Sequence, residues 1–303
     1  MSRRALVTGA TGFMGRHLCH VLRARGTHVV ALSRAGSGPV DADDRIELTD
    51  VLSVDAVEKA LERACPDTVF HLAGSTDASS PLEMYRVNTL FGLGLIRCAA
   101  RLSTRPVVLM TGSVAEYGPS TARQDLIPET APCQPASPYG ISKLAQTLHC
   151  LAEYGDSSIV ARLFNPVGTG MRSHLALGNF ARQLAVMGPQ GGDLRTGSLS
   201  AVRDFIDARA TAECLADLAM TPGARGGIFN VCSGVGTSLR DIVAAMIDRT
   251  KKPVRLIEDA SLGSLTSGQL DHVVGNPARL RELGLTPPGL DVAKLAGALM
   301  GEP

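Results

Sequence analysis

Short apolar runs alternate with stretches of helical periodicity along the first third of the chain. The runs have the length of strands, and they are Ala5–Val7, Val29–Leu32, Thr68–Leu72 and Val107–Met110. Arg45–Leu48, in which polar and apolar residues alternate, looks like a further strand. Between them apolar residues recur at helical spacing, over Met14–Arg25, Val54–Ala64 and Met84–Leu102. Strands that are apolar throughout are typical of a parallel sheet covered by helices on both faces. The pattern therefore predicts an α/β fold with a doubly wound parallel sheet.

The rhythm changes in the middle of the chain. A helical pattern over Tyr139–Tyr154 and a strand pattern over Ile159–Leu163 continue the alternation, but beyond Asn165 glycine and proline cluster and the elements shorten. Such a shift marks a second, smaller α/β lobe. The predicted division assigns residues 1–165, with a returning segment at about 206–233, to a Rossmann-like domain, and residues 166–205 and 234–303 to the smaller lobe.

Composition narrows the class of protein. Of the 303 residues 45% are hydrophobic and 19% charged, and the formal net charge is +1, so nothing points to nucleic acid or an anionic membrane as partner. The seven cysteines include no C-x-x-C pair, which favours free thiols over disulfides or a metal site. No apolar run reaches the roughly 20 residues of a membrane helix, and the first residues begin like a strand. We therefore expect a soluble, cytoplasmic protein without a metal.

A glycine-rich turn joins the first predicted strand to the first predicted helix. Gly9, Gly12 and Gly15 follow the spacing G-x-x-G-x-x-G. A turn without Cβ atoms lets backbone N–H groups and the positive helix end reach a pyrophosphate, and the last glycine lets helix and strand approach closely. At the first strand–helix junction of such a chain, the pattern predicts a dinucleotide site. The larger domain is therefore predicted to bind NAD(P), and the smaller lobe to bind the substrate.

The end of the second predicted strand bears on which dinucleotide is used. NAD-binding units place an acid there for the ribose hydroxyls. Here the strand ends in Ser33-Arg34, and the nearest following acid in the sequence is Asp41. Arg34 could clamp a 2′-phosphate through charge-assisted hydrogen bonds, with Ser33 as a neutral donor. NADP(H) is therefore favoured and NAD(H) is the alternative, because a solvated Arg34, or one stacked on the adenine, would not discriminate.

A candidate reacting centre lies further along the chain. Tyr139 and Lys143, spaced Y-x-x-x-K, share one face of a predicted helix. Ser113 follows a buried strand, at the edge where open α/β sheets bind ligands. The lysine would bring the pKa of the tyrosine toward neutrality and bind the nicotinamide ribose, while the serine would donate to a substrate carbonyl oxygen.

These motifs resemble the short-chain dehydrogenase/reductase superfamily, in particular its extended members of the NAD-dependent epimerase/dehydratase family, which act on nucleotide sugars. His71-Leu72-Ala73-Gly74 is similar to that family's H-L-A-A/G, Val87-Asn88-Thr89 to its V-N-x helix start, and Ser113–Gly118 to S/T-x-x-x-Y-G. The resemblance implies Ser113, Tyr139 and Lys143 as catalytic residues. It also implies a cofactor site formed by Gly9, Thr11, Gly12, Phe13, Met14, Gly15, Ser33, Arg34, Leu48, Leu72, Ala73, Gly74, Asn88, Tyr139 and Lys143. For Asn88, an ordinary polar position at a helix start is an equal alternative.

The later motifs resemble the GDP-4-keto-6-deoxy-D-mannose reductase branch. Arg162–Gly168 looks like R-x-F-N-x-x-G, and the R-D-F-x-D motif is present at Arg203–Asp207. The resemblance implies substrate contacts from Ser75, Ser113, Asn165 and Arg203, the last of them to the diphosphate. A strand-end cap is the alternative for Asn165, and an ion pair with Asp204 or Asp207 the alternative for Arg203. The family's x-V-R-D reads Ala208-Arg209-Ala210 here, which leaves the sugar and the base open.

One absence argues against dehydration. The sugar 4,6-dehydratases of this family carry an acid two residues after the Ser/Thr of that motif. Here Val114 and Ala115 follow Ser113, and neither can move a proton. Glu116 comes one residue too late and would face elsewhere.

The resulting hypothesis is NAD(P)H-dependent reduction of the keto group of a nucleotide-linked 4-keto-6-deoxyhexose, on GDP or dTDP. The alternatives are a nucleotide-sugar C4 epimerase with tightly bound NAD, a ketoreductase of a non-sugar natural product, and a dinucleotide-binding sensor without turnover. The resemblance also implies a homodimer paired through Met84–Leu102 and Tyr139–Tyr154, although these helices could equally pack on the sheet. The apolar residues available for pairing are Leu90, Leu93, Ile96, Ile141, Leu144 and Leu148.

Overall fold

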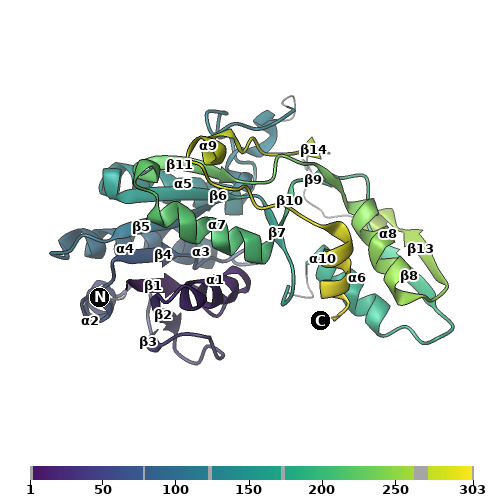
Figure 1. Ribbon diagram of the computed structural model, residues 1–303, viewed down its shortest axis with the longest axis horizontal. Coiled ribbons are helices and arrows are strands. Elements are labelled where there is room, and N and C mark those ends of the chain that lie inside the picture. Colours follow the sequence, from purple (N-terminus) through teal and green to yellow (C-terminus); the bar gives the residue numbers. More distant parts are fainter. Residues whose placement is uncertain (1–2, 78, 122–124, 172–174, 263–271, 302–303) are drawn as a thin grey trace.

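The computed structural model describes residues 3–77, 79–121, 125–171, 175–262 and 272–301. Figure 1 shows a larger lobe built around one sheet, which contains the N-terminus, and a smaller lobe at the other end of the molecule. Short strands β7, β9, β10 and β14 run between the two lobes (Figure 1).

Seven parallel strands form the central sheet, in the order β11-β6-β5-β4-β1-β2-β3. Their bounds are β1 Arg4–Thr8, β2 His28–Arg34, β3 Asp44–Leu48, β4 Thr68–His71, β5 Val107–Ser113, β6 Ser158–Leu163 and β11 Gly227–Val231. The five central strands are almost entirely buried, as their apolar sequences predict. The order 3-2-1-4-5-6, here extended by β11, is that of the Rossmann fold, which confirms the predicted fold class.

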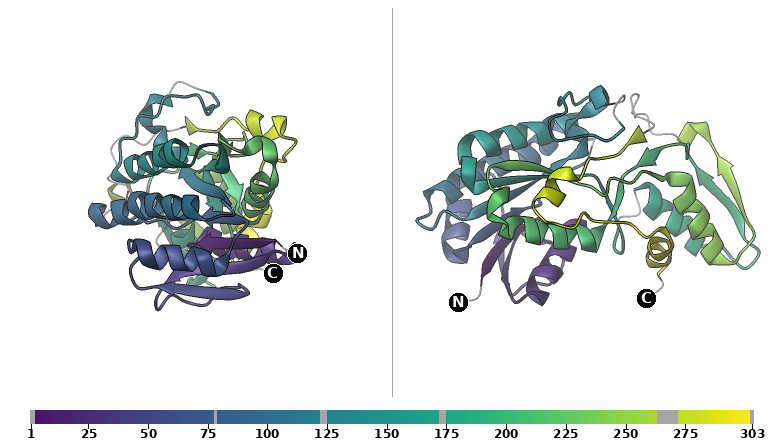
Figure 2. Two further views of the ribbon diagram at one scale, coloured as in Figure 1. Left: turned by 90° about the vertical axis from the view of Figure 1, so that its left-hand side faces the viewer. Right: turned by 45° about the horizontal axis from the view of Figure 1, so that its top comes forward.

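Helices cover both faces of the sheet (Figure 2). One face packs against α1 (Phe13–Ala24), α7 (Ala208–Met220) and the short α9 (Ala278–Glu282). The other packs against α2 (Val54–Ala64), α4 (Phe91–Arg101) and α5 (Pro138–Tyr154). Two apolar cores result, one on each side, so the carboxyl ends of the strands are held in a rigid row.

The smaller lobe has a core of its own. Helices α6 (Ala176–Ala185), α8 (Leu239–Thr250) and α10 (Val292–Leu299) pack with the parallel strands β8 (Gly192–Thr196) and β13 (Val254–Glu258). The strands between the lobes are the pair β7 (Asn165–Val167) with β10 (Phe205–Asp207), and the group β9 (Val202–Arg203), β12 (Thr237–Ser238) and β14 (His272–Val273).

The long helix predicted over Met84–Leu102 differs in the structure. It begins earlier, as α3 (Pro81–Tyr85), passes through a π-helical turn at Arg86–Leu90 and continues as α4. Pro81 starts the helix because its missing N–H group would have no partner in the first turn in any case. The expectation that Asn88 stands at a helix start is therefore wrong, since Asn88 lies within the helical run.

Part of the predicted pairing surface is not available at the surface. Ile96 is buried in the core beneath α4, whereas Leu90, Ile141 and Leu148 are exposed. The helical period explains the difference, because Ile96 lies on the face of α4 that turns toward the sheet. Within the described ranges, no helix combines the length and the apolar composition needed to span a membrane.

Candidate active site at the carboxyl edge of the sheet

The glycine turn has the geometry that a bound pyrophosphate needs. Gly9 has φ +67°, and a Cβ there would lie 2.7 Å from the backbone nitrogen of Ala73. A Cβ on Gly15 would overlap the Gly9 carbonyl oxygen. Gly12 caps α1 without a side-chain acceptor, and the first turn of α1 carries no acid. The helix start therefore offers its backbone N–H groups and positive end to an anion, which fits a dinucleotide.

The segment that follows β4 is tied to the glycine turn. Thr8 Oγ1 lies 2.9 Å from His71 Nδ1 and accepts a hydrogen bond from the backbone nitrogen of Ala73 at 3.2 Å. Leu72 and Ala73 are half-buried and Gly74 is exposed. Small residues here let this chain segment run close to Gly9.

Asn88 holds the next part of that segment. Its amide nitrogen donates to the carbonyl oxygen of Ser75 and to Ser142 Oγ, each at 2.9 Å, and its Oδ1 accepts from the backbone nitrogen of Ser75 at 2.7 Å. The side chain is fully buried. Asn88 therefore fixes the backbone of Ser75 against α5, a role that neither interpretation of its sequence position included.

The predicted catalytic residues come together from two elements. Ser113 ends β5, and Tyr139 and Lys143 occupy the first two turns of α5, which Ser137 caps. The Ser113 side chain lies near enough to the Tyr139 phenol to lower its pKa. Ser113 Oγ also accepts from the backbone nitrogen of Ala115 at 3.2 Å, so one lone pair is occupied and its O–H is left to donate. Lys143 is buried, and its Nζ donates to Gln146 Oε1.

The electrostatics of this group are set chiefly by burial. Burial raises the pKa of Tyr139, and the Ser113 side chain opposes that rise. Burial lowers the pKa of Lys143 to about 8, against the opposing charge of Glu116. Burial, with Lys143 nearby, lowers the pKa of His71 to about 3, so that imidazole is neutral. A lysine that titrates near the working pH beside a tyrosine is typical of a proton-transfer site.

Glu116 lies in the core next to Ser113. Its carboxylate is fully buried and accepts from the backbone nitrogen of Ser113 at 2.8 Å, from Arg162 Nε at 2.9 Å and from Thr147 Oγ1 at 3.0 Å. Ser113 and Glu116 form a capping box around the short 3₁₀ turn Val114–Glu116. The S-x-x-E spacing was the signal that could have revealed this arrangement.

The adenosine end of the site contains residues that sequence reasoning missed. Ser33 is buried at the end of β2, and Arg34 is exposed beside it. Glu47 of β3 lies in register with Ser33, and Arg45 donates to Ser33 Oγ at 3.2 Å and pairs with Glu47 at 2.7 Å. The Asp41 carboxylate instead pairs with Arg23 and His20. The sheet register thus brings Glu47 opposite Ser33, which distance along the chain does not reveal.

Leu48, also predicted to bind the cofactor, ends β3. Its side chain is buried in the core beneath the sheet, and its carbonyl oxygen accepts from the backbone nitrogen of Ala35. At the turn itself, Thr11, Phe13 and Met14 are half-buried around the start of α1.

Two of the predicted substrate residues, Asn165 and Arg203, lie in the strands between the lobes. Asn165 is half-buried in β7, and its amide nitrogen donates to the carbonyl oxygen of Asp204 at 3.1 Å. Arg203 lies in β9 and donates to the carbonyl oxygen of Val202. Asp204 is fully buried and accepts from backbone nitrogens of Ser233, Gly234 and Gly275, while Asp207 caps α7.

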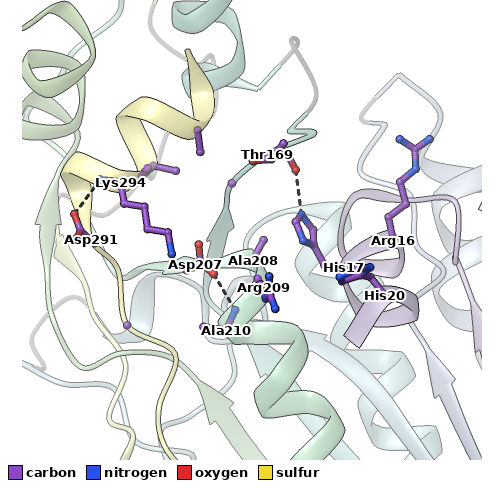
Figure 3. A pocket seen from close by; sticks show the side chains of 14 residues that line it. Arg16, His17, His20, Thr169, Asp207, Ala208, Arg209, Ala210, Asp291 and Lys294 are labelled. Atoms are coloured by element: carbon purple, nitrogen blue, oxygen red, sulfur yellow. Dashed lines mark hydrogen bonds between the residues drawn. The ribbon is translucent and has the colours of Figure 1, made fainter. Parts of the chain in front are cut away.

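A separate cavity lies between α1, the start of α7 and α10 (Figure 3). It measures about 630 Å³, and His17 on its wall lies 3.0 Å from the carbonyl oxygen of Thr169. None of the predicted site residues lines it. Among the described residues, no group of three or more His, Cys, Asp or Glu side chains is placed to hold a metal ion.

Curated relatives match this chain over most of its length. GDP-6-deoxy-D-mannose reductase of Pseudomonas aeruginosa is 28% identical over 100% of this chain and 97% of its own. dTDP-6-deoxy-L-talose 4-dehydrogenase (NAD(P)(+)) of Kitasatospora kifunensis is 30% identical over 84% of this chain and 81% of its own. UDP-glucose 4-epimerase of Azospirillum brasilense is 29% identical over 94% of this chain and 88% of its own.

Structural comparison agrees with these relatives. The structure of RMD from Pseudomonas aeruginosa, complexed with NADPH, matches with a TM-score of 0.81 at 25% identity and covers 98% of both chains. Residues 5–232 match the model of the NAD dependent epimerase/dehydratase family. The chain belongs to the NAD-dependent epimerase/dehydratase family and is an NAD(P)-dependent oxidoreductase.

Proposed function

We propose that this protein reduces the keto group of a nucleotide-linked 4-keto-6-deoxyhexose with NADPH. The observation that carries the proposal is the placement of Ser113 at the end of β5 next to Tyr139 and the buried Lys143 in the first two turns of α5. The nucleotide-sugar reductase and dehydrogenases among the relatives support the substrate class. Because these relatives act on sugars linked to different nucleotides, both GDP- and dTDP-linked sugars are used in the test.

Residues 1–165 and 206–233 would hold the dinucleotide, and residues 166–205 and 234–303 the nucleotide sugar. The uncapped start of α1 would bind the pyrophosphate, and Lys143 the nicotinamide ribose. The dinucleotide, when bound, supplies the hydride that reduces the sugar carbonyl. Asn165 and Arg203 would contact the sugar nucleotide, with Arg203 on its diphosphate because a planar guanidinium binds phosphate oxygens in pairs.

Tyr139 is the general acid in this proposal. Ser113 accepts from Ala115, so its hydroxyl hydrogen can polarise the substrate carbonyl oxygen. As negative charge develops on that oxygen, the phenol of Tyr139 donates its proton, and the charged Lys143 stabilises the phenolate that remains. Solvent then returns a proton to Tyr139. Glu116 is bound within the core and is therefore not placed to take part in a dehydration.

Arg34 would make NADPH the preferred cofactor. Arg34 is the exposed last residue of β2, and its positively charged guanidinium would form charge-assisted hydrogen bonds with a 2′-phosphate there. The negative charge of Glu47 would repel a 2′-phosphate. The Arg45 guanidinium, 2.7 Å from the Glu47 carboxylate, offsets that charge.

The test uses purified protein with NADPH and enzymatically prepared GDP- and dTDP-4-keto-6-deoxyhexoses. We expect loss of NADPH absorbance with at least one of them and weak activity on the free sugar, since the nucleotide is the main anchor. No consumption with any of these nucleotide sugars would refute the proposal.

A C4 epimerase is the second candidate, favoured by the UDP-glucose 4-epimerase relative. An epimerase keeps its dinucleotide through the catalytic cycle, so freshly purified protein would carry nicotinamide absorbance. We expect purified protein without it, and interconversion of UDP-glucose and UDP-galactose without added cofactor would decide for the epimerase.

A further inference from the structure

The buried charges behind the reacting centre have no part in the proton transfer described above. Glu116 is fully buried, and the Arg162 side chain is 3% exposed. A buried ion pair often contributes little to stability relative to apolar side chains of similar size, because both charges lose their hydration. Its presence directly beneath Ser113 therefore calls for a role other than core stability.

The Glu116 carboxylate joins three elements of the fold. Oε1 accepts a hydrogen bond from the backbone N–H of Ser113 at the end of β5. Oε2 accepts one from Arg162 Nε of β6 and one from Thr147 Oγ1 of α5. Thr147 lies one helical turn beyond Lys143, so this bond is made by the same helix that carries the reacting groups. One carboxylate thus connects Ser113 to α5, the helix that carries Tyr139 and Lys143.

The packing around the capped turn leaves little freedom. A Cβ on Gly140 would overlap the Ala115 carbonyl oxygen, so the first turn of α5 lies directly on the turn that Ser113 and Glu116 cap. A Cβ on Gly112 would lie 2.5 Å from Glu116 Oε1. Movement of the carboxylate would therefore shift both Ser113 and the start of α5.

We propose that Glu116 is a positioning residue of the reacting centre, whose carboxylate, held by Arg162, fixes the backbone of Ser113 and the register of α5 relative to each other. It acts through Ser113, Tyr139 and Lys143 and does not contact the substrate. The catalytic part of this inference rests on the proposed function, whereas the structural and electrostatic part does not.

The same carboxylate supplies negative charge to the site. It raises the pKa of both Tyr139 and Lys143. The other charged or titratable groups around them are Arg162 from β6, His71 from β4, and Cys133 and Tyr117 beside Arg162. His71 is neutral, and burial keeps the thiol and phenol protonated, so the Glu116–Arg162 pair contributes the fixed charges.

The first test follows Lys143 directly and needs no substrate. The chain has five lysines, so ¹³Cε-lysine NMR with Lys143→Arg for assignment resolves the titration of Lys143. In wild-type protein we expect a midpoint near 8. Glu116→Gln should lower that midpoint by about one pH unit, because the nearby negative charge is gone. An unchanged midpoint would overturn the electrostatic coupling.

Two control variants separate charge from shape. Glu153→Gln removes a carboxylate from an ion pair near the other end of α5 and should leave the Lys143 midpoint unchanged. Thr147→Val removes one hydrogen bond to Glu116 but keeps its charge, so the midpoint should also hold. If Glu116→Gln fails to fold because Arg162 is left unpaired, the double variant Glu116→Gln/Arg162→Met removes both charges. Its Lys143 midpoint should fall by less than in Glu116→Gln, because the positive charge of Arg162 is lost as well.

The second test is kinetic, with NADPH and the GDP- or dTDP-4-keto-6-deoxyhexose. The double variant should lose at least tenfold in kcat while the KM for NADPH changes little, since the cofactor-binding residues are intact. Equal loss in kcat and in NADPH affinity would contradict a positioning role. If wild-type protein reduces neither sugar, the proposed function fails, and the NMR titration still decides the role of Glu116.

Discussion

The two ends of the sheet's carboxyl edge handle charge in different ways. At the reacting end, Lys143 and the Glu116–Arg162 pair are almost entirely buried, and each has a fixed partner. At the adenosine end, Arg34 and Glu47 are exposed. Exposed ion pairs exchange partners and are screened by salt, whereas buried ones hold their geometry. The groups at the buried end are thus held in a fixed geometry, while those at the exposed end can be substituted without loss of the fold.

Tyr139→Phe should give the largest effect and bears on the reacting end. The ring and its packing remain, but the proton donor is lost, so kcat should fall by about 10²–10⁴-fold. The measurement is steady-state NADPH oxidation, with thermal unfolding to show that the fold is retained. Near-normal turnover would move the acid role to another residue.

Gly9→Ala should have the next largest effect, on cofactor affinity and stability. At φ +67° an alanine is strained, and its Cβ would press on the backbone of Ala73, for a loss of about 3 kcal/mol or more in unfolding free energy. Gly26→Ala is the matched control, because Gly26 has φ +75° with open space around it. Denaturant unfolding and the KM for NADPH measure both variants. If Gly26→Ala costs as much as Gly9→Ala, the close approach to Ala73 is not the cause.

The contacts of the candidate site differ in how well they could be predicted from the sequence. That Ser113, Tyr139 and Lys143 lie together could be predicted, because strand ends and helical spacing are local patterns that place side chains predictably. The contacts of Asn88 and Glu116 could not, since each is made with an element distant in the chain, Ser142 for one and Arg162 for the other. Glu47 was missed for the same reason, because only the β2–β3 register brings it opposite Ser33.

Arg34→Ala should shift the cofactor preference by about tenfold, which is the scale of one charge-assisted contact at an exposed site. We expect kcat/KM for NADPH to fall while that for NADH stays near its wild-type value. Arg25→Ala is the control, because Arg25 is also exposed and pairs with Asp217 elsewhere on the surface. A preference for NADPH that survives Arg34→Ala unchanged would exclude Arg34 as its determinant.

His71 should give the smallest effect at neutral pH, and a loss of stability that grows as the solution is made acidic. Its folded-state pKa, lowered to about 3 from 6.5, means that the unfolded chain binds a proton between these values while the folded protein does not. Stability is therefore fully present above pH 6.5 and falls as the pH drops toward 3, by at most about 1.4 kcal/mol per pH unit. His71→Gln should flatten this dependence between pH 7 and 5, measured by urea unfolding, whereas substituting the exposed His272 in the same way should not. Parallel curves for wild type and His71→Gln would mean that His71 is protonated in the folded protein, and that the region beneath Lys143 is less closed to charge than its burial implies.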